Sequence, residues 1–206
     1  MATLADLKAR IVADMGRDDM EPGGGLEPTL LAHINRAIRH YSGQNWWFLT
    51  KTATTPTVSG QDYVTRPTAI ARIRRISIPA LGYDLDRDDL ACIEAYDEPA
   101  SQTGQPYAWA EGDDATEIRL WPTPNAIFTL KIIGTRVFSD LSSDADTNVW
   151  TNEAADIIAA HTQMTLYRDV LQDPREANAG RALALALDAL TERNIDRFNM
   201  PVRAGW

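Results

Sequence analysis

The three histidines are the side chains best suited to metal or proton chemistry, and their spacing favours neither. His33 and His40 lie seven residues apart on one predicted helix, near the same face but two turns apart, and His161 is far along the chain. No His-Glu-x-x-His pattern occurs, and no cysteine cluster accompanies them. We therefore interpret them as surface or interface residues and predict neither a metal nor a cofactor.

Two runs of alternating acids, 84–88 and 144–148, suggest calcium ligands at first sight. An EF-hand loop needs glycine at its sixth position and a bidentate acid at its twelfth. Neither run has either residue. We interpret the runs as a turn and as a loop leading into a helix, where acids also favour the helix N-terminus.

Other catalytic signatures are absent. The glycines at 23–25 lack the lysine and the serine or threonine of a phosphate-binding loop, and no Gly-x-Ser-x-Gly pattern occurs. Trp46 and Trp47 favour core packing over a sugar-stacking platform. Cys92, the single cysteine, is predicted to be a small buried residue. A carboxylate pair for glycoside hydrolysis stays open among 29 acids, but abundance alone does not indicate one.

The charge balance argues against tight nucleic-acid binding. The chain of 206 residues has a formal net charge of −9, whereas proteins that grip phosphates usually present a basic face. One group of arginines forms a possible local patch, which we interpret as a solvated strand edge with salt bridges: Arg66, Arg72, Arg74, Arg75 and Arg87. No apolar run approaches the ~20 residues of a membrane span, and residues 1–8 do not suggest a signal peptide.

Two helices are predicted before residue 45. Thr3 can cap the first, and apolar residues at 4, 7, 11 and 15 form one stripe. Glu27-Pro28 starts the second, whose stripe is Leu31, Ile34, Ile38 and Tyr41, and Gly43 ends it.

Residues 46–138 change to strand patterns. Trp47-Phe48-Leu49 is predicted to open a strand, and 88–96 to form a short helix. In the run 70–78, a bulge near Arg74-Arg75 would put Ile73, Ile76 and Ile78 on one side.

Two more helices are predicted after the polar loop that follows Ser139. Thr151 or Asn152 can cap the third helix, and Asp173-Pro174 starts an alanine-rich fourth. The order predicts an α+β fold, a helix bundle with an inserted antiparallel β domain. Residues 1–45 supply its N-terminal helical part, 46–138 the β insertion, 139–198 its C-terminal helical part, and 199–206 an extended tail.

Several segments, taken in their order and spacing, carry a family resemblance: 34–48, 60–76, 104–108, 118–125 and 141–150, followed by a helix with Leu166-Tyr167 and an alanine-leucine helix. From about residue 4 to 198 the chain resembles the head-to-tail adaptors of tailed phages. The resemblance implies a non-enzymatic virion protein that forms a dodecameric ring under the portal and joins it to the tail tube or nozzle. Genome DNA would pass through the ring as cargo, with no membrane involved.

The same resemblance implies a neck location in the virion, after assembly in the host cytoplasm, and a C-terminal extension that reaches towards the portal. Here the candidate docking residues are Met200, Val202 and Trp206. Acids facing a channel would repel DNA phosphates, which gives the negative charge a role. Two alternatives stay open. A peptidoglycan hydrolase predicts a pocket of convergent acids, and a carbohydrate-binding module predicts exposed coplanar rings among Trp46, Trp47, Trp109 and Trp121.

Overall fold

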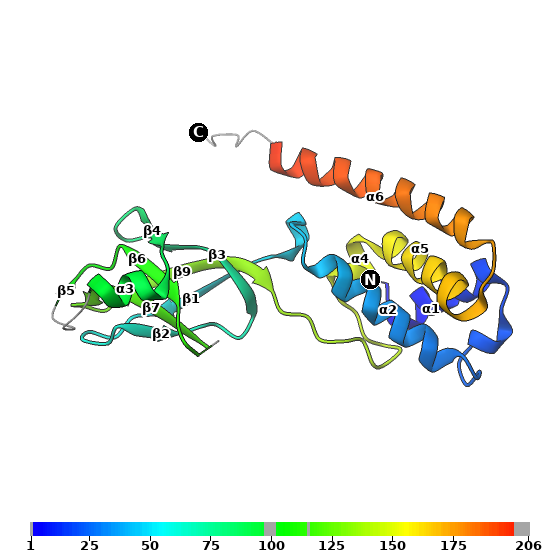
Figure 1. The fold of residues 1–206 in the computed structure, drawn as a ribbon, viewed down its shortest axis with the longest axis horizontal. Helices are drawn as coiled ribbons and strands as arrows, with labels where there is room; N and C mark the ends of the chain where they lie inside the picture. The colour runs from blue at the N-terminus through cyan, green and yellow to red at the C-terminus, as the bar shows by residue number, and fades with distance from the viewer. Residues whose placement is uncertain (1, 97–101, 115, 200–206) are drawn as a thin grey trace. The chain divides into compact units, whose positions relative to one another are not determined.

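The computed structural model describes residues 2–96, 102–114 and 116–199, without the side chains of 198 and 199. Its α+β fold confirms the predicted class (Figure 1). The chain forms two compact units. Met1–Leu49 and Phe138–Trp206 make the helical unit, and Thr50–Val137 make the β unit.

The first two helices of the helical unit follow the predicted stripes. Helix α1 (Leu4–Met15) begins at Thr3, whose hydroxyl accepts from the Asp6 N–H while the Asp6 carboxylate accepts from the Thr3 N–H. Helix α2 (Glu27–Ser42) follows a short 3-10 helix, η1 (Asp18–Met20). Along α2 the buried stripe begins at Leu30 rather than at Leu31, which is only half-buried.

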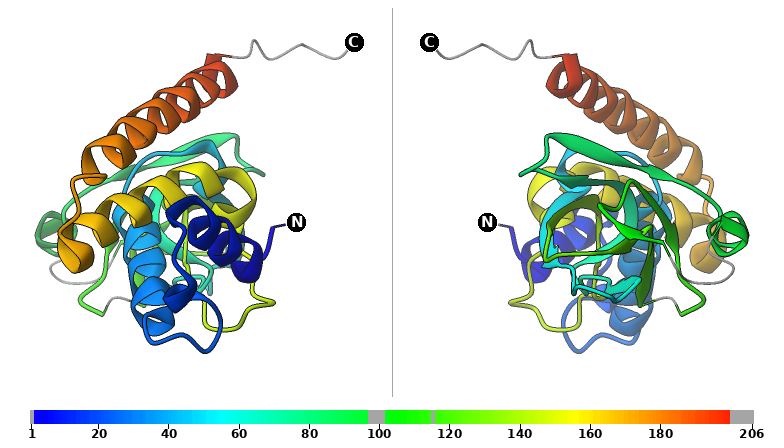
Figure 2. Two further views of the ribbon diagram at one scale, coloured as in Figure 1. Left: turned by 90° about the vertical axis from the view of Figure 1, so that its right-hand side faces the viewer. Right: turned by 90° about the vertical axis from the view of Figure 1, so that its left-hand side faces the viewer.

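The C-terminal part contains more helical segments than the two predicted. Asn148, not Thr151 or Asn152, caps the short α4 (Val149–Glu153). Helix α5 (Ala155–Leu166) continues into a π-helical turn, η3 (Tyr167–Leu171), and α6 (Glu176–Asn199) follows. Because α5 packs against α1, α2 and α6, it is the central helix of the unit (Figures 1 and 2). None of the described helices is long and apolar enough to cross a membrane.

The core of the helical unit centres on a fully buried tryptophan. The Trp150 ring packs among three other rings, with centroid distances of 5.1 Å to Phe48, 6.2 Å to Tyr41 and 6.5 Å to Phe138. Buried Asn35 on α2 donates to the Leu141 carbonyl and accepts from the Leu141 N–H, both at 2.9 Å. These contacts join segments from the two halves of the chain into one core.

The β unit is a curled mixed sheet. Within the described residues the strands run in the order β1-β9-β3-β4-β6-β7-β2, and the edge strands β1 and β2 contact each other (Figure 2). All neighbours are antiparallel except β4 and β6; a separate parallel pair joins β5 and β8. The short helix α3 (Leu90–Tyr96) packs on β6 and β7. The strands are β1 (Thr50–Pro56), β2 (Tyr63–Thr65), β3 (Ile70–Ile78), β4 (Tyr83–Arg87), β5 (Thr103–Gly104), β6 (Ala108–Glu111), β7 (Glu117–Trp121), β8 (Thr123–Pro124) and β9 (Thr129–Arg136).

The predicted bulge in β3 is confirmed. Pairing with β9 shifts register between Ile73 and Arg75, and Ile73, Ile76 and Ile78 are all buried. Each such side chain contributes roughly 1.5–3 kcal/mol on burial. The predicted strand start at Trp47 is wrong. Trp47–Leu49 forms a 3-10 helix, η2, because these rings pack into the helical core, and the strand begins at Thr50.

Candidate functional site

The structure brings two of the three histidines together. His40 on α2 and His161 on α5 have ring centroids 5.2 Å apart, and the Tyr41 hydroxyl lies 2.9 Å from His161 Nδ1. His33 lies apart from this pair, with its Nδ1 2.8 Å from the Thr165 hydroxyl. All three rings therefore belong to the surface where α2 meets α5.

Burial sets the protonation of His161. It lowers the pKa of His161 to about 4, and repulsion from His40 and Arg168 acts in the same direction. The pKa of His33 is lowered as well, mainly by burial. A histidine with so low a pKa is neutral and only weakly basic near pH 7. His161 is therefore poorly suited to acid–base catalysis at that pH.

A cavity of about 450 Å³ opens beside the two rings, lined by Arg36, Arg39, His40, His161, Met164, Thr165 and Arg168. Carboxylates engage all three arginines. Arg39 pairs with Asp140 at 2.5 Å, while Arg36 and Arg168 lie 3.5 and 2.7 Å from Asp169. The lining itself offers no carboxylate or thiol, so this cavity provides a cationic surface and lacks a hydrolytic acid–base pair.

The two acidic runs occupy different structures. Asp84 and Asp86 lie on strand β4, so the predicted turn is wrong there. In the second run, Asp146 accepts hydrogen bonds from the backbone N–H groups of the preceding serines, and Asn148 caps α4, as a loop leading into a helix requires. Among the described residues no group of three or more His, Cys, Asp or Glu could hold a metal ion.

The four tryptophans considered for sugar binding do not form an exposed platform in the described structure. Trp46 and Trp109 are buried. Trp47 is half-buried beneath the Arg193 guanidinium, 5.1 Å from the ring. Trp121 meets Tyr107 edge-on, at 78° between the ring planes. Coplanar stacking on a sugar needs exposed parallel rings, and these tryptophans instead pack against their own unit.

The prediction that Cys92 is buried is wrong. The thiol is exposed on α3, and the helix buries its neighbour Ile93 instead. The negative charge of Asp88 raises the pKa of the thiol, and burial and Asp89 add to that effect. Because the thiolate is the reactive form, Cys92 lacks the lowered pKa of a catalytic cysteine.

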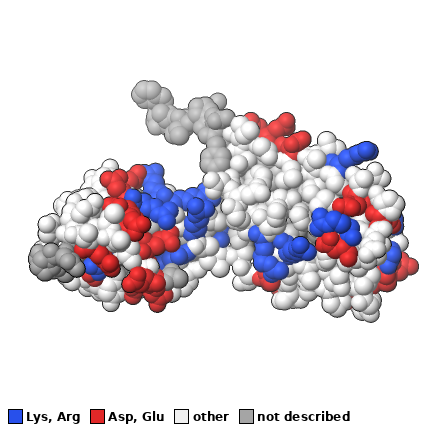
Figure 3. Space-filling model, viewed as in Figure 1, with Lys and Arg blue, Asp and Glu red and all other residues white. Residues whose placement is uncertain are grey.

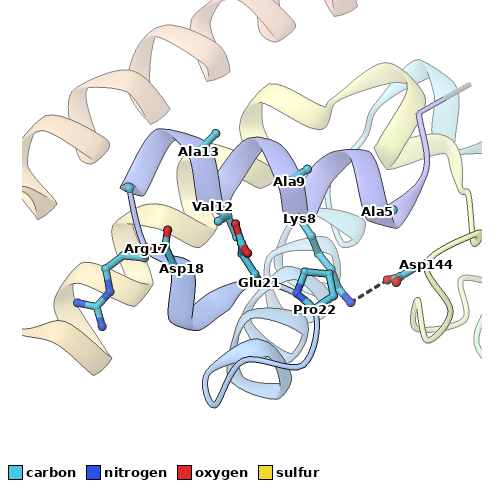
Figure 4. A pocket seen from close by; sticks show the side chains of 11 residues that line it. Ala5, Lys8, Ala9, Val12, Ala13, Arg17, Asp18, Glu21, Pro22 and Asp144 are labelled. Carbon is cyan, nitrogen blue, oxygen red and sulfur yellow. Dashed lines mark hydrogen bonds and ion pairs between the residues drawn. The ribbon is translucent and has the colours of Figure 1, made fainter.

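The helical unit also holds an ion-pair cluster that sequence patterns do not indicate. The Lys8 ammonium is buried and lies 2.9 Å from a carboxylate oxygen of Glu27 and 2.9 Å from one of Asp144. Figure 4 shows the pair with Asp144. Its partners are 19 and 136 residues away in the chain, so no local spacing could reveal them. The cluster borders a groove of about 280 Å³ along the alanine-bearing side of α1, and it ties α1 to α2 and to the loop before α4.

Four of the five arginines in the predicted patch lie on two neighbouring strands, and Arg66, between β2 and β3, donates to the Ile70 carbonyl at 3.1 Å. Arg72, Arg74 and Arg75 lie on β3, and Arg75 pairs with Asp84 at 2.7 Å. Arg87 belongs to β4, pairs with Glu111 at 3.2 Å and lies over the Trp109 ring. The salt bridges of Arg75 and Arg87 agree with the prediction, but the predicted strand edge is wrong, because β3 pairs with both β9 and β4. The proposed docking residues Met200, Val202 and Trp206 lie outside the described residues.

A comparison with protein-family models matches residues 2–205 to the SU10 adaptor protein. The chain belongs to the SU10 adaptor protein family. A comparison with curated proteins found no match. Family membership confirms the resemblance noted in the sequence and gives the chain a structural role as a bacteriophage adaptor.

Proposed function

We propose that this adaptor forms a ring below the phage portal and joins the portal to the tail, with DNA passing through the ring. The observation that carries the proposal is the family match over residues 2–205. In the virion, at the neck, its partners are the portal, a tail tube or nozzle protein and further copies of itself, which the resemblance puts at twelve in the ring. Assembly takes place in the host cytoplasm.

The same proposal makes the protein a non-enzyme. Its support is physical. His161 is neutral near pH 7, the exposed thiol has a raised pKa, and the cationic cavity lacks a carboxylate in its lining. Acyl transfer and hydrolysis need an activated nucleophile or a matched acid and base. Cell-wall and nuclease assays should find no activity that a single Asp or Glu substitution abolishes.

The net charge of −9 fits a conduit for DNA. A surface of the same sign as the phosphates repels them, which keeps the polymer moving instead of bound. The like charges also make free copies repel one another, so we expect the ring to assemble on the portal as a template.

The segment after Phe198 is the proposed portal-docking element. Met200, Val202 and Trp206 are apolar groups on eight residues that include Pro201, which cannot continue a helix cleanly. Burying them gains ~25 cal/mol per Å², while ordering each residue costs ~1–2 kcal/mol. The net per copy is small, so docking would depend on many copies acting at once.

Light scattering on the free protein, the portal and their mixture tests the proposal. We expect monomers or weak oligomers alone and a defined complex with the portal. A variant ending at Phe198 is the matched control, because it should keep its melting temperature and lose portal association. Absence of any complex with the full chain would overturn the function. A truncated variant that binds normally would overturn only the docking assignment.

A further inference from the structure

Charge is unevenly distributed within the β unit. Residues 50–79 and 125–137 carry seven Lys and Arg against the single acid Asp62, whereas residues 80–124 carry two arginines against eleven acids. On the face of the unit visible in Figure 3, Lys and Arg atoms gather in one area, and Asp and Glu atoms gather in others. Both signs of charge are therefore concentrated on a single small unit.

The positive charges share one side of two paired strands. Lys131 and Thr135 are four residues apart on β9, so their side chains lie on the same face of the sheet. Arg72 on β3 pairs directly with Thr135 and shares that face. Arg74 donates to the Thr135 hydroxyl at 3.1 Å, which brings it to that face. Together with Arg75 these residues form the basic sheet face: Arg72, Arg74, Arg75 and Lys131.

Little on the unit neutralises that face. Arg75 has Asp84 as its partner, at 2.7 Å. The exposed side chains of Arg72 and Lys131 have no hydrogen-bond or ion-pair partner among the described residues. Two exposed cations on a rigid ladder are available to an anionic partner.

The negative charges meet where α3 packs on β6 and β7. Glu94 of α3, together with Asp113 and Glu117 from the β6–β7 turn, surrounds a depression of about 170 Å³. Arg119 also lines it but pairs with Asp62, so it does not neutralise these acids fully. We define the acidic end as this trio and the neighbouring exposed or half-buried acids: Asp86, Asp88, Asp89, Glu94, Asp113 and Glu117.

We propose that the basic sheet face of one copy binds the acidic end of the next copy, so that the β units associate head to tail. This inference rests on the proposed ring. A contact between two different surfaces of the same chain is heterologous, and such contacts form a ring when the rotation between neighbours closes and an open filament when it does not. Complementary charge would fix the orientation of neighbours that otherwise repel through their net charge. DNA is a poorer partner, because the acidic end of the same unit repels phosphates.

Charge reversal gives a test with internal rescue. Arg72→Glu/Lys131→Glu removes the net positive charge of the basic face, and Glu94→Lys/Asp113→Lys reduces the acidic end from six negative charges to a net two. Each variant alone weakens the attraction and places like charges at the substituted positions of every contact, and we expect its portal-bound fraction at half-saturating concentration to fall by about tenfold. In an equimolar mixture the substituted positions of every contact in an alternating ring again carry opposite charges, so binding should recover. Circular dichroism of each variant verifies that it is folded.

The outcomes separate the two proposals. If the wild-type chain fails to bind the portal, the adaptor proposal fails. If it binds, and both variants bind equally well without mixing, only the head-to-tail contact is wrong. Wild-type binding to double-stranded DNA that Arg72→Glu/Lys131→Glu abolishes would also overturn the contact and reassign the basic face to nucleic acid.

Zero-length cross-linking tests the contact directly, with or without the portal. The chain has only three lysines, and Lys8 is buried, so a carbodiimide can join few amines besides Lys51 and Lys131 to carboxylates. In a mixture of isotopically light and heavy chains, we expect links from Lys131 of one copy to Glu94 or Asp113 of another. Lys131→Arg keeps the charge and should remove the link while preserving portal binding. Absence of inter-copy links both on the portal and in concentrated protein would overturn the proposal.

Discussion

The helical unit and the β unit use their charges in opposite ways. In the helical unit, acids and bases pair across elements that are distant in the chain, as Arg10 does with Asp156 at 2.5 Å and Arg193 with Glu153 at 3.2 Å. In the β unit the bases collect on β3 and β9, whereas most acids lie on β4, on α3 and on the β6–β7 hairpin. Ion pairs link distant elements of the first unit, whereas the second pairs Arg75, Arg87 and Arg119 but leaves Arg72 and Lys131 exposed with no partner among the described residues.

Their cores differ as well. The helical unit is built around aromatic rings that touch Trp150, while the β unit buries mainly branched aliphatic side chains on β3 and β9. The two cores share no residue. We therefore expect each unit to respond to damage in its own core, and the following predictions test that separation.

Trp150→Ala should have the largest effect. Trp150 is fully buried, and truncating such a ring typically costs about 3–5 kcal/mol. We expect a loss of that size in denaturant unfolding followed by circular dichroism at the helical signal. Amide hydrogen exchange should accelerate in α2, α4 and α5 while β3 and β9 stay protected.

Gly134→Ala is the matched test in the β unit. A Cβ on Gly134 would meet the Arg72 carbonyl oxygen and the Ile70 side chain, and such overpacking typically costs about 1–3 kcal/mol. Exchange should now accelerate in β3 and β9 and stay slow in the helices. If either substitution opened both units equally, the contrast between two separate cores would fail.

Lys8→Met should come next in size. Removing one partner of a fully buried ion pair costs about 3–5 kcal/mol, and because Asp144 is about half exposed we expect about 2 kcal/mol here. Lys131→Met removes an exposed charge from the β unit and should change stability by less than about 0.5 kcal/mol. Denaturant midpoints of the two variants give the comparison. Equal effects would mean that the Lys8 cluster contributes nothing beyond surface charge.

Local spacing predicted much of the fold. The Thr3 capping box, the α2 boundaries and the β3 bulge all depend on residues within a few positions of one another. Trp47-Phe48-Leu49 misled because its apolar pattern fits a strand equally well, and only packing against Trp150 decides between the two.

The surfaces were less predictable because they form between distant segments. The Cys92 error arose because a seven-residue helix is too short for its apolar pattern to distinguish the buried side from the exposed side. The side that is buried is decided by the strands on which the helix packs. Likewise, Glu94 and Asp113 meet only because α3 packs on the β6–β7 hairpin. The arginines of β3 were visible in the sequence, but the face they share with Lys131 depends on the β3–β9 register.

Acid should weaken the helical unit through His161. The unfolded chain binds this proton near the ordinary pKa of 6.5 and the folded chain only at about 4, so stability is complete above 6.5 and falls as the pH drops towards 4. We expect a loss of roughly 1–2 kcal/mol, after allowing for the partial exposure of the ring. The measurement is the denaturant midpoint of the helical signal between pH 7 and 4.5.

His161→Gln should remove most of that slope and leave the smaller contribution of His33, whose pKa is also lowered. The hydrogen bond from Lys8 lowers the pKa of Glu27, so its contribution to stability begins to fall in the ordinary glutamate range, at the acidic end of this window. The difference between wild type and His161→Gln isolates the histidine contribution, because both chains share that carboxylate loss. A wild-type midpoint that stays constant from pH 7 to 4.5 would contradict the assignment.

The smallest effect concerns Cys92, whose thiol reports on the uncompensated charge of the acidic end. Asp88 raises its pKa, so less thiolate is present at neutral pH and alkylation by a maleimide should be slow for an exposed cysteine. Asp88→Asn should accelerate labelling by a factor of about two to five at low salt, and by less at high salt as ions screen the charge. Asp156→Asn is the control in the helical unit, because Arg10 already compensates that charge. If both substitutions left the rate unchanged, the acids near Cys92 would be as well neutralised as those of the helical unit, and the contrast in charge between the two units would not hold at this site.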